Sequence, residues 1–378
     1  MDFVGTDYLY ALTMMRRFFI LNFFLLAFTA SGQAPFSHHT PQYTYAESRA
    51  LFDRSLYSPA AEGFRKVISL VDSETDLSEQ SNFFKVLCSI KLMNRDAGDQ
   101  VLKFLGEYPT SARRKELFIE MADYSFNRRR YREAKNWLMR LNGMFLPKKE
   151  KAELQFKLGY SLFMLKEYEV SRAQFSAAKS SKFKIASSAQ YYYGHIAYLD
   201  TNDITALENL EPLKDHPDFG FVVPYYLAQI YSRRQMDDEL LRLGESLLKE
   251  ASVKRAPEIA KLIGQSLLRK KRFDEALPYL LMHRDRGGKM TPSDYYELGV
   301  LLAKADRYKE AIQSLNKITT TRSSVSEFAL YLLADCYVKE GQNENALSAF
   351  RAVSEIANDE VIREESAFQT AKLTYQGS

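Results

Sequence analysis

The stretch that decides the fold reads PSDYYELGVLLAKADRYKEAIQSLNKI and covers residues 292–318. Its first half places Tyr295, Leu298 and Leu302 at helical spacing, and its second half gives the same spacing to Ala311 and Leu315. Residues 305–308 interrupt the first pattern before the second begins. The stretch therefore predicts two antiparallel helices joined by a short turn, each with one apolar stripe.

Small residues mark the same two places in copies of this stretch along the chain. The first place returns about every 35 residues, a period that indicates an array of stacked units. It is occupied by Ser48, Cys88, Ala122, Gly159, Gly194, Ala228, Gly264, Gly299 and Ala334. The second place, twelve residues later, is occupied by Ala60, Gln100, Ala134, Ser171, Ala206, Leu240, Ala276, Ala311 and Ala346. We expect Gly299 and Ala311 to face each other where two helices cross, with Gln100 and Leu240 marking irregular units.

These positions resemble the tetratricopeptide repeat family, whose unit of about 34 residues has small residues at its eighth and twentieth positions. The resemblance implies an all-α fold. The expected architecture is an α-solenoid, a right-handed superhelix of about nine stacked antiparallel helix pairs. Each unit packs on its neighbours, so the array needs no single central core.

The N-terminus carries the pattern of a secretory signal peptide. Arg16 and Arg17 precede an apolar run, residues 18–28, which ends in a small and polar stretch. The run is shorter than the roughly 20 residues that span a membrane, so we expect cleavage near Gly32, with an uncleaved single-pass anchor as the alternative. Residues 1–13 fit no signal peptide, so Met14 or Met15 is a more natural start than Met1. The expected organisation is 1–32 as extension and signal, 33–43 as a flexible lead, and 44–378 as the array.

The last residues predict a first helix, residues 364–375, without a second one. Arrays usually end in a helix with a polar outer face, whereas Phe368, Leu373 and Tyr375 give this helix an apolar stripe. We expect that the natural polypeptide continues. The alternative is that this helix is itself the cap.

Charge and motifs argue against nucleic-acid binding and catalysis. The net charge of +4 is too small for a dominant basic face. Residues 264–268 lack the second glycine of a nucleophile elbow, and residues 287–291 lack the first glycine of a phosphate loop. His38 and His39 have no partner at metal-ligand spacing. We therefore expect no enzyme activity, no cofactor and no metal, and buried unpaired thiols at Cys88 and Cys336.

Basic clusters fall at the predicted turns between helices. They comprise residues 128–130 with Arg132, residues 233–234 and residues 269–272. They could form an edge that meets an anionic lipid, a polysaccharide or an acidic partner. The alternative is that they are solvated and complement helix C-termini.

Aromatic residues gather at the positions that line the concave surface in the family that the chain resembles. The resemblance implies a partner-binding groove made of Phe126, Phe156, Tyr160, Phe163, Tyr191, His195, Tyr198, Tyr225, Tyr296 and Tyr331. Such a surface suits an extended or helical peptide. Alternatively, neighbouring first helices bury part of these rings against one another.

These features predict an exported, non-catalytic scaffold that binds a protein or peptide in the periplasm or cell envelope. The chain resembles the N-terminal part of large exported bacterial repeat proteins. Nucleic acid is not an expected partner, and membrane contact is expected only through an uncleaved signal segment. Two alternatives remain: the solenoid of a larger cell-wall-processing enzyme, and a membrane-anchored assembly factor.

Overall fold

The computed structural model describes residues 40–377, except residues 251, 253 and 319–323. The predicted signal peptide and most of the predicted lead lie outside the described residues. The chain divides into two compact units, residues 1–117 and 118–378. Every regular element in the described part is a helix, which confirms the all-α prediction. None of these helices is both long enough and apolar enough to span a membrane.

The first unit contains two helix pairs. They are α2 (Pro41–Asp53) with α3 (Tyr57–Leu70), and α4 (Asp76–Lys91) with α5 (Ala97–Glu107). The start of α2 corrects the predicted boundary at residue 44. Thr40 caps this helix by accepting a hydrogen bond from the Tyr43 N–H (3.3 Å), and Pro41 suits the first helical turn. Residues 41–43 therefore belong to the array and not to the lead.

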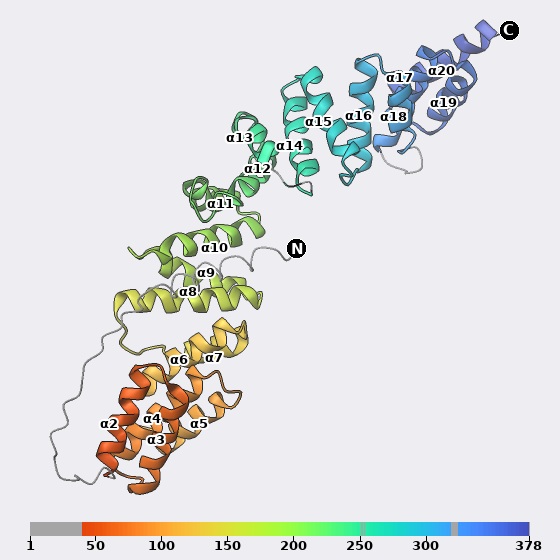
Figure 1. The fold of residues 1–378 in the computed structure, drawn as a ribbon. Coiled ribbons are helices and arrows are strands. Elements are labelled where there is room, and N and C mark those ends of the chain that lie inside the picture. The colour runs from red at the N-terminus through yellow and green to blue at the C-terminus, as the bar shows by residue number, and fades with distance from the viewer. Residues whose placement is uncertain (1–39, 251, 253, 319–323, 378) are drawn as a thin grey trace, which may run out of the picture. The chain divides into compact units, whose positions relative to one another are not determined.

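The second unit continues with helix pairs in the same alternation (Figure 1). Its first pair begins with α6, which starts before the unit boundary. The pairs are α6 (Arg114–Asn127) with α7 (Tyr131–Met139), α8 (Lys148–Met164) with α9 (Tyr168–Lys179), α10 (Ile185–Leu199) with α11 (Asp203–Leu210) and the short η1 (Glu211–Leu213), α12 (Val223–Arg233) with α13 (Asp237–Glu250), α14 (Ala256–Arg269) with α15 (Phe273–Asp285), α16 (Pro292–Lys304) with α17 (Tyr308–Leu315), and α18 (Ser324–Lys339) with α19 (Asn343–Ile356). The last helix, α20 (Glu360–Gly377), leaves Phe368 and Tyr375 62% and 85% exposed. The described residues thus form nine helix pairs and one further helix, as the repeat count predicts.

A residue with left-handed backbone geometry marks the turn of each pair. In eight pairs it lies seven residues after the predicted eighth position. These residues are Ser55, Arg129, Lys166, Thr201, Gln235, Lys271, Asp306 and Gly341, with φ between 55° and 71°. The next residue donates its N–H back to the first helix, as Arg307 does to the Leu302 carbonyl (2.9 Å). This bonding is typical of helix ends with a left-handed residue, and it gives the array a structural register.

The second pair departs from the register predicted from the sequence. Its left-handed residue is Met93 (φ 59°), five and not seven residues after Cys88. The turn therefore assigns Val86 to the eighth position. Twelve residues after Val86 stands Gly98, and the fully buried small residue of α5 is its neighbour Ala97 (0% exposed), not Gln100. The prediction for Cys88 and Gln100 was wrong because the chain enters the turn two residues earlier than in the other pairs.

Small residues let the two helices of a pair approach closely, and a larger side chain from the second helix packs on the first small residue. A Cβ atom added at Gly299 would lie 2.6 Å from Leu315 Cδ2, and one added at Gly159 would lie 2.9 Å from the Phe175 ring. The glycine therefore makes room for the side chain four residues beyond the second small position. Ser171 fills that second position and donates its hydroxyl to the Gly159 carbonyl (2.7 Å).

In the sixth pair, a large residue stands at the second small position and a small residue stands four residues later. Leu240 occupies the second small position and is 1% exposed. Four residues later, a Cβ added at Gly244 would lie 2.7 Å from Ile263 Cγ1. Because Ile263 belongs to α14, Gly244 lets α13 approach the first helix of the following pair closely.

Candidate partner-binding surface

Aromatic rings from α6 to α10 and from α12 form one connected cluster in the second unit. Its ring centroids lie 4.6–6.2 Å from their neighbours. One path through it joins Phe126 to Tyr160 (5.5 Å), Tyr160 to Tyr192 (5.2 Å), Tyr192 to Phe163 (5.3 Å), Phe163 to His195 (5.6 Å) and His195 to Tyr226 (4.9 Å). We call it the aromatic cluster: Phe126, Tyr131, Phe156, Tyr160, Phe163, Tyr168, Phe175, Tyr191, Tyr192, His195, Tyr198, Phe219, Tyr225 and Tyr226.

Eight of the ten predicted groove residues belong to this cluster. Seven of them are partly exposed: Phe126, Phe156, Tyr160, Phe163, His195, Tyr198 and Tyr225. Their rings contact one another between neighbouring first helices, as expected from the alternative in which these helices bury part of the rings against one another. Tyr296 and Tyr331 lie apart from the cluster. Tyr296 packs on the core around α14 to α18, and the Tyr331 ring lies 5.7 Å from Phe350.

Tyr191 differs from the other predicted groove residues because it is 1% exposed. Its ring stacks on Phe219, with centroids 4.6 Å apart and planes at 12°. Phe219 lies in the segment between η1 and α12. Burial, and then the proximity of Tyr226, raises the pKa of Tyr191 above its ordinary value. Tyr191 therefore supports the aromatic cluster from beneath and does not line its surface.

Two central members of the cluster, Tyr192 and Tyr226, were missed in the sequence analysis. Tyr192 contacts Phe156, Phe163 and Phe175, and together with His195 it joins α8 to α10. Both residues stand at the sixth position of their units, outside the positions used to define the groove. The doublets Tyr191-Tyr192 and Tyr225-Tyr226 are the sequence signal that could have identified them.

His195 makes the centre of the cluster neutral at physiological pH. Burial lowers the pKa of its imidazole to about 4. Its ring lies between Phe163 and Tyr226, with centroids 5.6 and 4.9 Å away. The imidazole therefore acts as one more aromatic ring in an apolar surface.

Cations and an amide border the cluster on the α10 and α12 side. The Tyr198 hydroxyl donates to Gln229 Oε1 (2.5 Å). Arg233 lies over the Tyr198 ring at 4.8 Å, and Arg255 lies over the Tyr225 ring at 4.9 Å. These cation–π contacts hold the two rings in place. Because Arg233 is also paired with Asp203, Arg255 supplies the positive charge at this border.

Five of the ten cations in the basic clusters form ion pairs with carboxylates of the described chain. Arg269 and Lys270 of α14 bind Asp237 and Asp238 of α13 (2.6 and 2.8 Å), and Arg233 of α12 binds Asp203 of α11 (2.5 Å). Burial alone would raise the pKa of Asp237, but the bonds from Arg269 and Ser266 hold it below its ordinary value. These ion pairs join successive helix pairs, which favours the structural reading of the clusters.

The described part of the chain shows no group of three or more His, Cys, Asp or Glu side chains that could hold a metal ion. Cys88 and Cys336 are free and buried, and burial raises the pKa of each thiol to about 12. Residues 264–268 lie within α14, and residues 287–291 lie between α15 and α16. Residues 264–268 are thus part of a helix, and residues 287–291 link two helix pairs.

Comparisons with known proteins found one family model and several similar solved structures. Residues 329–360, within α18 to the start of α20, match the family model described as tetratricopeptide repeat. No curated protein matches the chain. Similar solved structures include MamA (23% identity over 46% of this chain and 93% of that chain, TM-score 0.40). Two others are the C-terminal part of a TPR repeat-containing protein from Cytophaga hutchinsonii (15%, 67% and 93%, TM-score 0.39) and yeast Tom70 (12%, 89% and 96%, TM-score 0.32). The family model confirms the predicted tetratricopeptide repeat at residues 329–360.

Proposed function

We propose, from the tetratricopeptide-repeat architecture of this chain, that it is a non-catalytic scaffold that binds a protein partner at the aromatic cluster. The fold is consistent with such a scaffold. The observation that carries the proposal is the continuity of partly exposed rings from α6 to α12. Aromatic side chains supply large contact areas at low entropic cost and dominate many binding surfaces.

Exposed apolar residues extend this surface at the ends of two first helices. Met164 follows Phe163 at the end of α8 and is 45% exposed, and Leu199 follows Tyr198 at the end of α10 and is 38% exposed. With a neutral His195 at the centre and Arg255 at the border, the surface suits an apolar segment with an acidic flank. A helix or an extended strand of a partner could supply such a segment.

We also propose that the chain is exported and acts in the cell envelope, because of the signal-peptide pattern in residues 16–34. Mass spectrometry of the mature N-terminus tests this proposal. A chain that begins near Gln33 is expected. A retained apolar segment would favour the membrane-anchored alternative, and a cytoplasmic full-length chain would refute export.

A photo-crosslinking experiment tests the binding surface. A photoreactive amino acid replaces Met164 on the surface, and a second variant carries it at Val170, which is 53% exposed on α9. In cells, the position 164 variant is expected to form a discrete crosslinked product that the position 170 variant lacks. Equal crosslinking from both positions, or none from position 164, would refute binding at this surface.

A further inference from the structure

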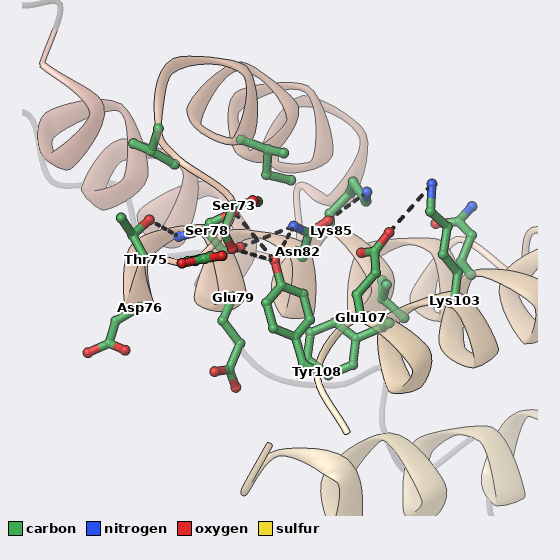
Figure 2. A pocket seen from close by; sticks show the side chains of 16 residues that line it. Ser73, Thr75, Asp76, Ser78, Glu79, Asn82, Lys85, Lys103, Glu107 and Tyr108 are labelled. Atoms are coloured by element: carbon green, nitrogen blue, oxygen red, sulfur yellow. Dashed lines mark hydrogen bonds and ion pairs between the residues drawn. The ribbon is translucent and has the colours of Figure 1, made fainter. Parts of the chain in front are cut away.

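Two joined clefts lie in the first unit, away from the aromatic cluster in sequence. One has a volume of about 700 Å³ and is bounded by the end of α3, the loop of residues 71–75, α4 and α5. The other, about 720 Å³, lies between α3, α4 and the start of α5. Lys85 and Gln100 line both clefts, so the two meet at these side chains. Figure 2 shows the first of them.

The floor of the clefts is a polar stripe on α4. Ser78, Asn82, Lys85 and Ser89 line the clefts at spacings of four, three and four residues, which puts them on one helix face. Buried helix faces are usually apolar. Here Asn82 donates to the Tyr108 hydroxyl (3.2 Å), and Lys85 donates to Asn82 Oδ1 (3.0 Å), as the dashed lines in Figure 2 show. The stripe is therefore prepared for a polar occupant.

Lys85 is a half-buried cation whose contact is a neutral amide. Among the described residues it forms no ion pair with a carboxylate. Burial, and then the nearby charge of Lys103, lowers the pKa of its ammonium group; Glu107 acts in the opposite direction, and Arg65 lowers the pKa further. Arg65 and Lys103 are themselves held by Glu62 and Glu107 at 3.8 Å, which is long for an ion pair. An added carboxylate at this junction would relieve the repulsion and use the remaining Lys85 donors.

Carboxylates line the other end of the first cleft. Glu74 and Asp76 line it without an ion pair to any described residue, while Glu79 accepts a hydrogen bond from Ser111 (2.6 Å). Figure 2 shows Asp76 and Glu79 on the side away from Lys85 and Lys103. Nine residues of α4 separate Asp76 from Lys85, a rise of about 13 Å. An extended peptide covers that distance in about four residues.

We infer that these clefts bind an extended peptide segment that carries an acidic side chain at Lys85 and a basic side chain about four residues away, near Asp76. This site is separate from the aromatic cluster and does not depend on the function proposed for it. An elongated channel with opposite charges at its ends favours a peptide over a compact anion.

Lysine-selective NMR on the full chain tests this inference directly. Reductive ¹³C-methylation labels the lysines and keeps their charge, and the spectrum of Lys85→Gln assigns the Lys85 signal. The probe is the blocked heptapeptide Ser-Glu-Thr-Val-Thr-Lys-Ser, together with the same peptide in reverse order. One of the two peptides is expected to shift the Lys85 signal saturably. Its affinity should be at least fivefold higher than that of the same peptide with Gln in place of Glu.

Variants and a competing anion complete the test. Lys85→Gln is expected to weaken peptide binding at least fivefold, measured by fluorescence anisotropy of the labelled peptide. Lys66→Gln, at an exposed lysine of α3 that does not line the clefts, is expected to leave it unchanged. Three results would overturn the inference: no saturable shift with either peptide, an equal loss in both variants, or displacement of the peptide by inorganic phosphate at equal concentration.

Discussion

Replacing Gly159 by alanine tests how closely the helices of a pair approach beneath the aromatic cluster. The new Cβ would lie 2.9 Å from Phe175 Cδ1 and Cε1, and 3.2 Å from Gln174 Cβ. Phe175 is 0% exposed and stacks on Tyr192, with centroids 5.3 Å apart and planes at 16°. The rigid ring has no free space to move into, so α8 and α9 must separate or the Tyr192 stack must shift.

The expected magnitude follows from two opposing effects. Overpacking a well-packed core costs about 1–3 kcal/mol. Alanine recovers about 1 kcal/mol through its better helix propensity. We therefore expect Gly159→Ala to lower the free energy of unfolding by up to about 2 kcal/mol.

Gly106→Ala in α5 is the matched control, because no atom lies within 4 Å of its added Cβ. There the propensity gain stands alone, and unfolding should become harder by up to about 1 kcal/mol. Urea unfolding followed by circular dichroism, with the slope checked for constancy, measures both. A Gly159→Ala chain as stable as the Gly106→Ala chain would refute the close approach.

Three further predictions concern pH, packing and ion pairs. His195 has a folded-state pKa of about 4, below its unfolded value near 6.5, so its neutral form contributes stability above pH 6.5 that is lost as the pH falls, by about 3 kcal/mol at pH 4. In a series of urea unfolding midpoints measured at different pH, His195→Phe should therefore lose less stability at low pH than the unmodified chain. Parallel midpoint-against-pH curves for the two proteins would contradict this. Leu240→Ala should cost about 2–5 kcal/mol in urea unfolding, because the leucine is 1% exposed in the exchanged pair; a cost under about 0.5 kcal/mol would show that Leu240 is not a core residue. Arg269→Gln should lower the free energy of unfolding by about 1 kcal/mol or less, since the ion pair of Arg269 with Asp237 is partly exposed. This difference from the unmodified chain should shrink in high salt, and a salt-independent difference would mean that packing dominates.

The repeat period could be predicted from the sequence because each small residue answers a local steric need. Gly159, Gly264 and Gly299 stand where a neighbouring side chain leaves no room for a Cβ, and this need recurs with the period of the fold. The register of the second pair could not be predicted in this way. Its turn is set by the backbone of Met93, and nothing in the side chains around Cys88 signals that the helix ends early.

The sequence predicted most members of the aromatic cluster that lie at groove positions, but not which of their rings are buried. Position within the unit identified eight members of the aromatic cluster. It could not separate Tyr191, which stacks beneath on Phe219, from Tyr198, which stays partly exposed. The burial of Tyr191 depends on a loop between η1 and α12 that has no counterpart in the repeat pattern.

The most direct test of the central claim is the affinity of the crosslinked partner for the full chain and for a double variant, Tyr160→Ala with Tyr198→Ala. Both rings are partly exposed members of the aromatic cluster. The matched control is Tyr193→Ala, a partly exposed tyrosine of α10 whose ring lies under Lys179 (3.8 Å) and which is not a member of the aromatic cluster. The account predicts at least a tenfold loss of affinity in the double variant, with unchanged helicity, and no loss in the control. Equal affinity of all three proteins would contradict it.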